Sequence, residues 1–160
     1  MSKKIVVYFS HSGNTREIAN QIQKSVSGDI FEIQSLENYP SNYNAVVKKA
    51  RQELESGYKP ALKAKVSNIR SYDVVFIGCP IWCGTIPMPV VTFLSGYDFS
   101  GKTIIPFCTH EGSGLGRSIT DIAKLCPQSK ILEGLAVRGR DVKSAQNEVS
   151  EWLGEIGVIE

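Results

Sequence analysis

A dense group of hydrogen-bond donors lies near the start of the chain, in the stretch SHSGNT that begins at Ser10. Its hydroxyl and amide side chains belong to Ser10, Ser12, Asn14 and Thr15, and Gly13 lies among them. An apolar run ends just before this stretch, and a helical pattern begins just after it. Unpaired N–H groups and the helix dipole favour an anion at the start of a helix. The stretch therefore predicts a site for a phosphate monoester that is held by neutral donors.

The competing interpretation of this stretch is a plain helix cap, because serine, threonine and asparagine are favoured at helix N-termini. A single cap accounts for one or two such residues and leaves the other donors unexplained, so the phosphate interpretation is preferred. His11 is expected to face solvent as a spacer in the loop.

Two later loops also follow apolar runs and combine glycine with hydroxyl or aromatic side chains. One is GCPIWCGTIP, in which Trp82 stands between Pro80 and Gly84, and the other is THEGSG, which begins at Thr109. A lone tryptophan is usually a packing residue. Trp82, however, follows a buried strand at the edge where a ligand would bind, so it is predicted to stack on a flat ligand.

The elements that must hold these loops alternate between strand and helix along the chain. The expected strands are Lys4 to Phe9, Ile30 to Ile33, Asp73 to Gly78, Thr103 to Cys108 and Ile131 to Val137, and the expected helices are Asn14 to Val26, Tyr43 to Glu55, Pro87 to Leu94, Gly116 to Leu125 and Val142 to Ile156. The third strand is apolar at every interior position, which is typical of a parallel sheet covered on both faces. Right-handed crossovers then predict one α/β domain over residues 1–160, a doubly wound three-layer sandwich with a five-stranded parallel sheet. Ligands of such sheets bind beyond the carboxyl ends of the strands, where all three loops fall.

The composition is that of an ordinary globular domain, with 160 residues, 42% hydrophobic, 21% charged, and a net charge of +2. The stretch Leu36 to Tyr72 is longer than one crossover helix needs, so it is expected to carry an extra loop. It is also basic, since seven basic residues lie from Lys48 to Arg70 against Glu53 and Glu55. These charges are either a solvated surface or a patch that attracts an acidic partner or a phosphorylated cofactor.

Other classes of protein find little support in the sequence. No targeting segment is expected, and no apolar run approaches the roughly 18 residues of a membrane span. The four cysteines form no CxxC pair and are expected to be reduced thiols in a cytoplasmic protein. No metal-ligand spacing or nucleic-acid-binding motif is present. GYDFSGKT, from Gly96 to Thr103, matches a phosphate-loop expression but precedes a strand instead of a helix, so it is rejected.

The loops together resemble those of the flavodoxin family. SHSGNTREIA, from Ser10, is similar to the FMN-phosphate loop of flavodoxins, and GCPIWCGTIP, from Gly78, is similar to their flavin loop. PFCTHEGSGLG, from Pro106, falls where the family has its third flavin loop. The resemblance extends over nearly the whole chain. It implies a flavodoxin-like sheet with strand order 2-1-3-4-5 and FMN at the point where the winding reverses.

This resemblance also implies which residues bind the cofactor. They are Ser10, Ser12, Gly13, Asn14, Thr15, Pro80, Ile81, Trp82, Cys83, Gly84, Thr109, His110, Glu111 and Gly112. Trp82 would stack on the flavin, and the N–H groups of Thr109 to Gly112 would bond its pyrimidine edge. His110 and Glu111 are equally well explained as loop surface. The Cys83–Gly84 peptide would reverse on flavin reduction, with Gly84 in the left-handed conformation that a type II turn needs at its third residue; otherwise Gly84 only lets the loop turn tightly.

Two features depart from the family pattern. Flavodoxins are usually strongly acidic, whereas this chain is slightly basic. Their third loop often places a tyrosine over the second flavin face, and this third loop has none, so that face is expected to be open.

Three functions remain open. The preferred one is a monomeric FMN-binding electron carrier of the flavodoxin type, whose flavin would cycle between three oxidation states. Its expected partners are a reductase and an electron acceptor. Binding to nucleic acid or to a membrane is not expected. The second is an FMN-dependent reductase of quinones or similar acceptors that uses NAD(P)H; the open flavin face and the basic segment favour it, but no nicotinamide site is evident. The third is a flavin-free binding module on the same fold.

Overall fold

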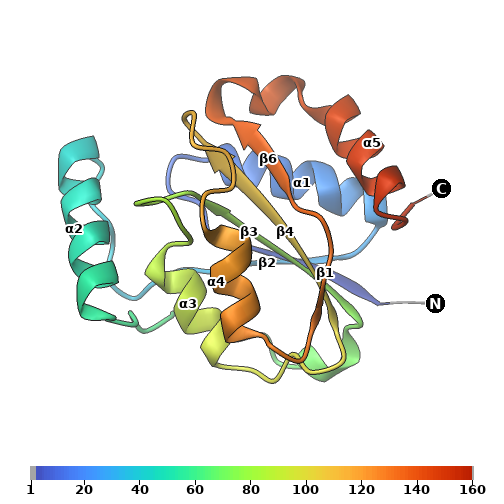
Figure 1. Ribbon diagram of the computed structural model, residues 1–160, viewed down its shortest axis with the longest axis horizontal. Helices are drawn as coiled ribbons and strands as arrows, with labels where there is room; N and C mark the ends of the chain where they lie inside the picture. The colour runs from blue at the N-terminus through green and yellow to red at the C-terminus, as the bar shows by residue number, and fades with distance from the viewer. Residues whose placement is uncertain (1–2, 160) are drawn as a thin grey trace.

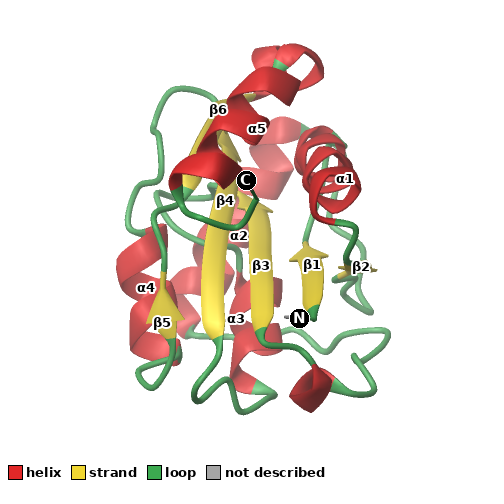
Figure 2. Ribbon diagram, turned by 90° about the vertical axis from the view of Figure 1, so that its right-hand side faces the viewer, coloured by secondary structure: helices red, strands yellow, loops and turns green. Residues whose placement is uncertain are grey.

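A single parallel sheet forms the centre of the computed structural model, which describes residues 3–159. Its strands are β1 (Lys4–Tyr8), β2 (Asp29–Glu32), β3 (Val74–Pro80), β4 (Thr103–His110), β5 (Lys130–Ile131) and β6 (Leu135–Arg138). They follow the order β2-β1-β3-β4-β5, and β6 also pairs with β4. Figure 2 shows this sheet face-on, with β5 and β6 one above the other along β4. The strand order 2-1-3-4-5 implied by the resemblance is confirmed.

Helices cover both faces of the sheet and give the predicted three layers. One face packs against α1 (Asn14–Val26) and α5 (Gln146–Glu155), and the other against α3 (Met88–Ser95) and α4 (Ser118–Leu125), as Figure 1 shows. Alternation along the strands explains the two cores. Val6 and Phe76 join the core under α1 and α5, whereas Ile5 and Val75 join the core under α3 and α4.

Helix α2 (Tyr43–Ser56) stands apart at one end of the sheet (Figure 1). It begins where the Asn42 side chain accepts a hydrogen bond from the backbone N–H of Ala45, 3.0 Å away, and it ends at Gly57 with φ of 68°. Its buried side chains are Val46, Ala50 and Glu53, which recur at helical spacing and form one face. The extra loop expected between the second and third strands is present. It contains an antiparallel bridge between Ser35 and Leu62 and a short 3₁₀ helix, η1 (Ile69–Ser71).

The fifth strand differs from the prediction, because Ile131 to Val137 is broken into β5 and β6. The backbone N–H of Leu132 donates to the carbonyl of Ile104. From Ile104 onward, the backbone N–H and C=O groups of every second residue of β4 therefore point toward the fifth strand. The next such residue is Pro106, which has no N–H to donate, and the ladder is interrupted there. Beyond β6, a 3₁₀ helix, η2 (Gly139–Ser144), precedes α5, so the final α-helix is shorter than predicted.

The rejected phosphate-loop match lies where the sequence placed it, between the end of α3 and the start of β4. No helix among the described residues is long and apolar enough to cross a membrane.

Candidate functional site

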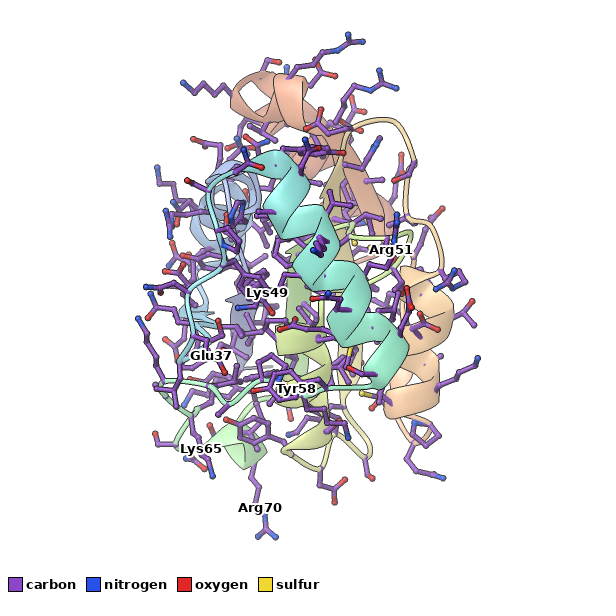
Figure 3. All side chains as sticks on the ribbon, turned by 90° about the vertical axis from the view of Figure 1, so that its left-hand side faces the viewer. Glu37, Lys49, Arg51, Tyr58, Lys65 and Arg70 are labelled. Atoms are coloured by element: carbon purple, nitrogen blue, oxygen red, sulfur yellow. The ribbon has the colours of Figure 1, made fainter. Side chains whose placement is uncertain are left out.

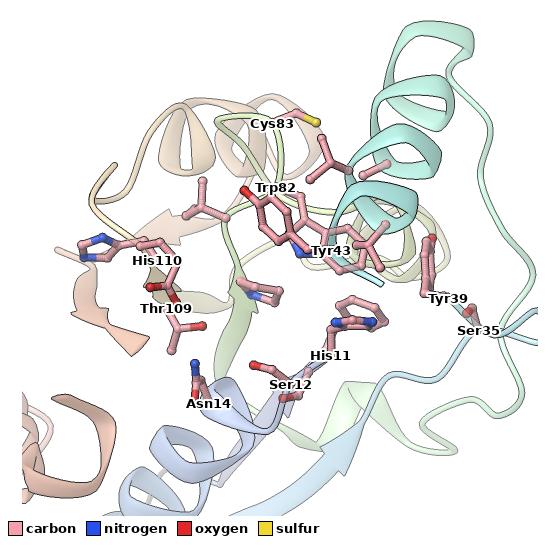
Figure 4. A pocket seen from close by; sticks show the side chains of 18 of the residues that line it. His11, Ser12, Asn14, Ser35, Tyr39, Tyr43, Trp82, Cys83, Thr109 and His110 are labelled. Carbon is pink, nitrogen blue, oxygen red and sulfur yellow. The ribbon is translucent and has the colours of Figure 1, made fainter. Parts of the chain in front are cut away.

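One pocket of about 1370 Å³ opens at the carboxyl ends of β1, β3 and β4, where the three loops meet. All the residues predicted to bind the cofactor line it except Gly13 and Thr15. Figure 4 shows Ser12 and Asn14 on one side of the pocket, Thr109 and His110 beside them, and Trp82 facing them from the second loop. The topology therefore brings together residues that lie up to about a hundred positions apart in the sequence.

The first loop keeps several donors free. The Ser10 hydroxyl oxygen accepts hydrogen bonds from the N–H groups of Gly13 and Arg16, at 3.2 and 3.3 Å. Helix α1 has Gly13, with φ of 100°, at its N-cap, so the N-cap residue itself offers no side chain. Within residues 3–159 the N–H groups of Ser12, Asn14 and Thr15 have no hydrogen-bond partner. Helix capping thus accounts for Ser10 alone, and the remaining donors fit an anion.

Thr15 holds a different position from the one expected. Its side chain is only 1% exposed, and its hydroxyl oxygen lies 2.8 Å from that of Thr109. This hydrogen bond ties the start of α1 to the end of β4. The Thr15 hydroxyl is therefore a link between the first and third loops. The residues of the first loop that line the open pocket are Ser10, His11, Ser12 and Asn14.

The charges near the first loop come from outside it. Arg16 turns away, with Nη2 2.6 Å from Glu32 Oε2 and Nε 3.3 Å from the Tyr8 hydroxyl. These hydrogen bonds, the one to Tyr8 foremost, raise the pKa of Arg16. Arg138, at the end of β6, was not predicted as a site residue. Its Nη2 lies 3.7 Å from the place that a Cβ on Gly112 would occupy, so it supplies a cation to the rim of the third loop.

A carboxylate also approaches the first loop. A Cβ added to Gly139 would lie 2.5 Å from Glu111 Oε1 and 2.6 Å from Asn14 Nδ2, so these two polar groups converge beside Gly139. Glu111 is exposed, yet its carboxylate oxygen is directed toward Asn14 of the first loop. An anion bound there would be repelled by Glu111 and attracted by Arg138.

Trp82 is surrounded by aromatic rings that meet it at steep angles. The ring centres of Phe9, Tyr39 and His11 lie 5.3, 5.0 and 5.7 Å from that of Trp82, with interplanar angles of 88°, 65° and 73°. His11 Nε2 also lies 2.9 Å from the Pro40 carbonyl oxygen. His11 is exposed as expected, and its ring in addition contacts that of Trp82, so it is more than a spacer in the loop.

The second loop turns at Cys83 and Gly84. Trp82 and Thr85 exchange both backbone hydrogen bonds, at 2.9 and 3.1 Å, so they close a two-residue hairpin. Both central residues have positive φ, 54° at Cys83 and 80° at Gly84, which is the pattern of a type I′ turn. Reversal of its central peptide gives type II′, in which only the first central residue keeps positive φ. After the reversal, Cys83 would be the central residue that keeps positive φ, so its side chain opposes the change. The sequence had suggested that a side chain substituted for Gly84 would oppose it.

The second and third loops are joined to each other. The backbone N–H of Arg117 donates to the Gly84 carbonyl oxygen at 2.7 Å. Gly116, with φ of 55°, passes so close that a Cβ there would lie 2.3 Å from the same oxygen. The Thr85 hydroxyl donates to the carboxylate of Asp121 on α4. The turn that carries Trp82 is therefore fixed against the third loop and α4.

The third loop uses one of its predicted donors internally. His110 Nδ1 accepts a hydrogen bond from the N–H of Gly112 at 2.9 Å. Thr109 and His110 lie in β4 and pair with β6, because this strand runs two residues beyond its predicted end. The N–H of Gly112, which was predicted to bond a ligand, therefore bonds the His110 side chain instead.

Two tyrosines of the pocket were missed by sequence reasoning. Tyr39 lies between Trp82 and α2, and Tyr43, the first residue of α2, is 77% exposed and projects in front of Trp82 in the view of Figure 4. Their position depends on how the long segment between β2 and β3 folds back onto the loops. The only signal in the sequence was the excess length of that segment.

The fold and this pocket define the flavodoxin-like class of α/β proteins, in which ligands bind where the strand order reverses. The chain belongs to the flavodoxin family, whose model matches residues 3–156. A search of the curated proteins found no significant match.

Similar structures extend over nearly the whole chain. A candidate flavoprotein from Bacteroides eggerthii is 34% identical, with a TM-score of 0.86 and 98% of each chain covered. A candidate flavoprotein from Bacteroides uniformis is 29% identical, with a TM-score of 0.85 and coverage of 96% of this chain and 98% of that one. A flavoprotein from Lactobacillus acidophilus, solved in complex with FMN, is 20% identical, with a TM-score of 0.74 and coverage of 94% and 99%, and this likeness bears on the fold.

Proposed function

We propose that this protein binds FMN in the pocket at the strand ends and serves as a flavodoxin-type electron carrier. When bound, the flavin supplies the redox chemistry, and the protein supplies binding and orientation. Ser12, Asn14 and the free N–H groups at the start of α1 would hold the phosphate. Trp82 would provide an aromatic wall, and the ends of β3 and β4 would hold the ring system.

One observation carries the proposal: the first turn of α1 presents unpaired N–H groups and polar side chains to a pocket that Trp82 also lines. A helix N-terminus with free donors suits a phosphate monoester, and a tryptophan suits a flat conjugated ring. Membership of the flavodoxin family supports the same cofactor. The flavin-free binding module is disfavoured because it leaves both features without a ligand.

The experiment compares FMN with riboflavin, which lacks only the phosphate. Ser12→Ala and Asn14→Ala are expected to weaken FMN binding by about tenfold each, because hydrogen bonds to charged groups contribute about 1.5–3 kcal/mol. Riboflavin affinity should stay unchanged in both variants. Binding is followed by the quenching of tryptophan fluorescence, to which Trp82 in the pocket should contribute more than the buried Trp152.

Ser41→Ala is the matched control, because Ser41 also lines the pocket but belongs to the segment before α2. It should leave the affinity for both ligands unchanged. Equal weakening of FMN and riboflavin by Ser12→Ala would show that the phosphate is not held by the first loop.

An FMN-dependent reductase with its own small-molecule substrate is the second candidate, and the extent of the pocket favours it. The lining continues past the flavin loops along α2, farther than the cofactor loops alone require.

As an electron carrier, the protein would act as a monomer in the cytoplasm with protein redox partners, and its four free cysteines agree with a reducing compartment. Anaerobic addition of NADPH separates the two candidates. Rapid bleaching of the flavin absorbance without a partner reductase supports the enzyme, and persistence until a reductase is added supports the carrier.

A further inference from the structure

The pocket is larger than one cofactor site usually needs. Ligand pockets typically enclose about 300–1,000 Å³, whereas this one has about 1370 Å³. Its lining divides into two sets of residues. The first set comes from the three loops at the strand ends, and the second comes from α2 and the segments that flank it. We call the second part the α2 lobe; it is lined by Ser35, Asn38, Tyr39, Ser41, Tyr43, Val46, Val47, Ala50, Arg51 and Lys63.

The α2 lobe has an apolar floor and aromatic walls. Val46 and Ala50 are buried, and Val47, next to Val46 on α2, is half-buried. Tyr39 meets Trp82 edge-to-face, and its hydroxyl donates to the carboxylate of Glu53, which holds its ring in place. Surfaces of this kind bind flat conjugated molecules, which lose little conformational freedom on binding and bury both faces.

Tyr43 adds a large aromatic surface at the mouth of the lobe. It is the most exposed of the large hydrophobic side chains in the described part of the chain, at 77%. Its backbone is well fixed, because it opens a helix that Asn42 caps. An aromatic ring held on a rigid helix start beside a pocket is suited to cover a bound ligand.

The charges of the lobe favour an anion. Arg51 and Lys63 are exposed at its rim, and no salt bridge engages either of them among residues 3–159. Two carboxylates line the pocket: Glu32 is paired with Arg16, and Glu111 belongs to the third loop. Figure 3 shows Arg51 and Lys49 on different sides of α2, with Lys65 and Arg70 farther along the same face of the molecule. The basic segment is therefore spread over that face, and Arg51 and Lys63 are its members that line the pocket.

We propose that the α2 lobe is a second ligand site, which binds a flat aromatic molecule carrying an anionic group. This proposal rests on the proposed function, because it assigns the strand-end loops to FMN. Trp82 belongs to the wall shared by the two parts of the pocket, since its ring contacts both His11 of the first loop and Tyr39 of the lobe.

The test measures binding to FMN-loaded protein by calorimetry with two probes that share the anthraquinone ring system and carry either a charged or an uncharged substituent at the same position. Anthraquinone-2-sulfonate is flat and anionic, and 2-(hydroxymethyl)anthraquinone is flat and uncharged. The sulfonate is expected to bind about tenfold more tightly than its uncharged analogue. Arg51→Gln combined with Lys63→Gln should abolish this difference and leave the affinity for the uncharged probe unchanged.

Two further variants make the test specific. Lys48→Gln combined with Lys59→Gln removes two charges from the same segment at positions that do not line the pocket, and it should leave both probes unaffected. Val47→Phe fills the lobe and should weaken both probes by about tenfold or more, with FMN affinity unchanged.

Three results would overturn the proposal: equal affinity of the unmodified protein for the two probes, a loss of the preference for the sulfonate in the Lys48 and Lys59 control as large as in the Arg51 and Lys63 variant, or displacement of FMN by the sulfonate. Failure of the proposed function would be visible separately, as the absence of FMN binding before any probe is added.

Discussion

Glu111 places a negative charge beside Asn14 of the first loop, and Arg138 places a positive charge beside Gly112 of the third loop. Both charges can be tested through the cofactor phosphate. Glu111→Gln removes a repulsion and is expected to strengthen FMN binding, whereas Arg138→Gln removes an attraction and is expected to weaken it. Each change should be about two- to fivefold, because both groups are near the surface and are screened by salt. Riboflavin, which has no phosphate, is the control ligand. Similar changes in riboflavin affinity would contradict the placement of the phosphate at this edge.

The hairpin at Cys83 and Gly84 makes a second residue-level prediction, on the stability of the flavin-free protein. Gly84→Ala puts a Cβ at φ of 80° and should destabilise the fold by about 1 kcal/mol. Cys83→Gly relieves the same strain at φ of 54°, but it adds backbone freedom to the unfolded chain, so the two effects should nearly cancel. Urea unfolding measures both, with Cys83→Ser as the control that keeps a Cβ. A larger loss from Cys83→Gly than from Gly84→Ala would argue against the type I′ turn.

A part-buried hydrogen bond helps to hold helix α2 to the site. The Tyr39 hydroxyl donates to Glu53, whose side chain is buried on the inner face of α2. Burial and this hydrogen bond raise the pKa of Tyr39. Tyr39→Phe leaves the carboxyl group without its donor and should cost about 1–3 kcal/mol of unfolding free energy. Native-state hydrogen exchange should locate the loss in α2 and leave the central strands protected.

Glu53→Gln, combined with Tyr39→Phe, tests whether the two side chains of this contact act together. A glutamine oxygen still accepts from Tyr39 and costs less to bury than a charge, so Tyr39→Phe should be less damaging in the Glu53→Gln protein. Additive effects of the two substitutions would show that the two side chains do not act together.

At the scale of the whole molecule, the sheet should weaken in alkali. The Tyr72 hydroxyl donates a hydrogen bond to Asp29, which links the start of β2 to the residues just before β3. This hydrogen bond, and burial to a smaller extent, raises the pKa of Tyr72 to about 12. An unfolded tyrosine ionises near pH 10. Between about pH 10 and 12 the unfolded chain therefore binds fewer protons, and stability falls as the pH rises. Tyr72→Phe should flatten this slope in urea unfolding measured from pH 8 to 11. A slope unchanged by the substitution would exclude Tyr72 as its source.

The parts of the structure that sequence reasoning predicted are those governed by local pattern. Helix α1 has its predicted bounds, and the apolar run of β3 reports burial on both faces. The break between β5 and β6 arises from Pro106 on a neighbouring strand, so the pattern of Ile131 to Val137 could not reveal it. The link from Thr15 to Thr109 and the place of Tyr39 depend on segments distant in sequence, and no local signal specifies such contacts.

The hydrogen bond from Arg117 to Gly84 has a consequence for how the site moves. Because this bond closes the second loop against the third, and the Trp82–Thr85 hairpin closes the second loop on itself, neither loop can open alone without breaking backbone bonds. The amides of Trp82, Thr85 and Arg117 then belong to one cooperative opening unit and should share a single exchange free energy. That shared value, measured by hydrogen exchange before and after cofactor addition, would report the rigidity of the two loops amide by amide.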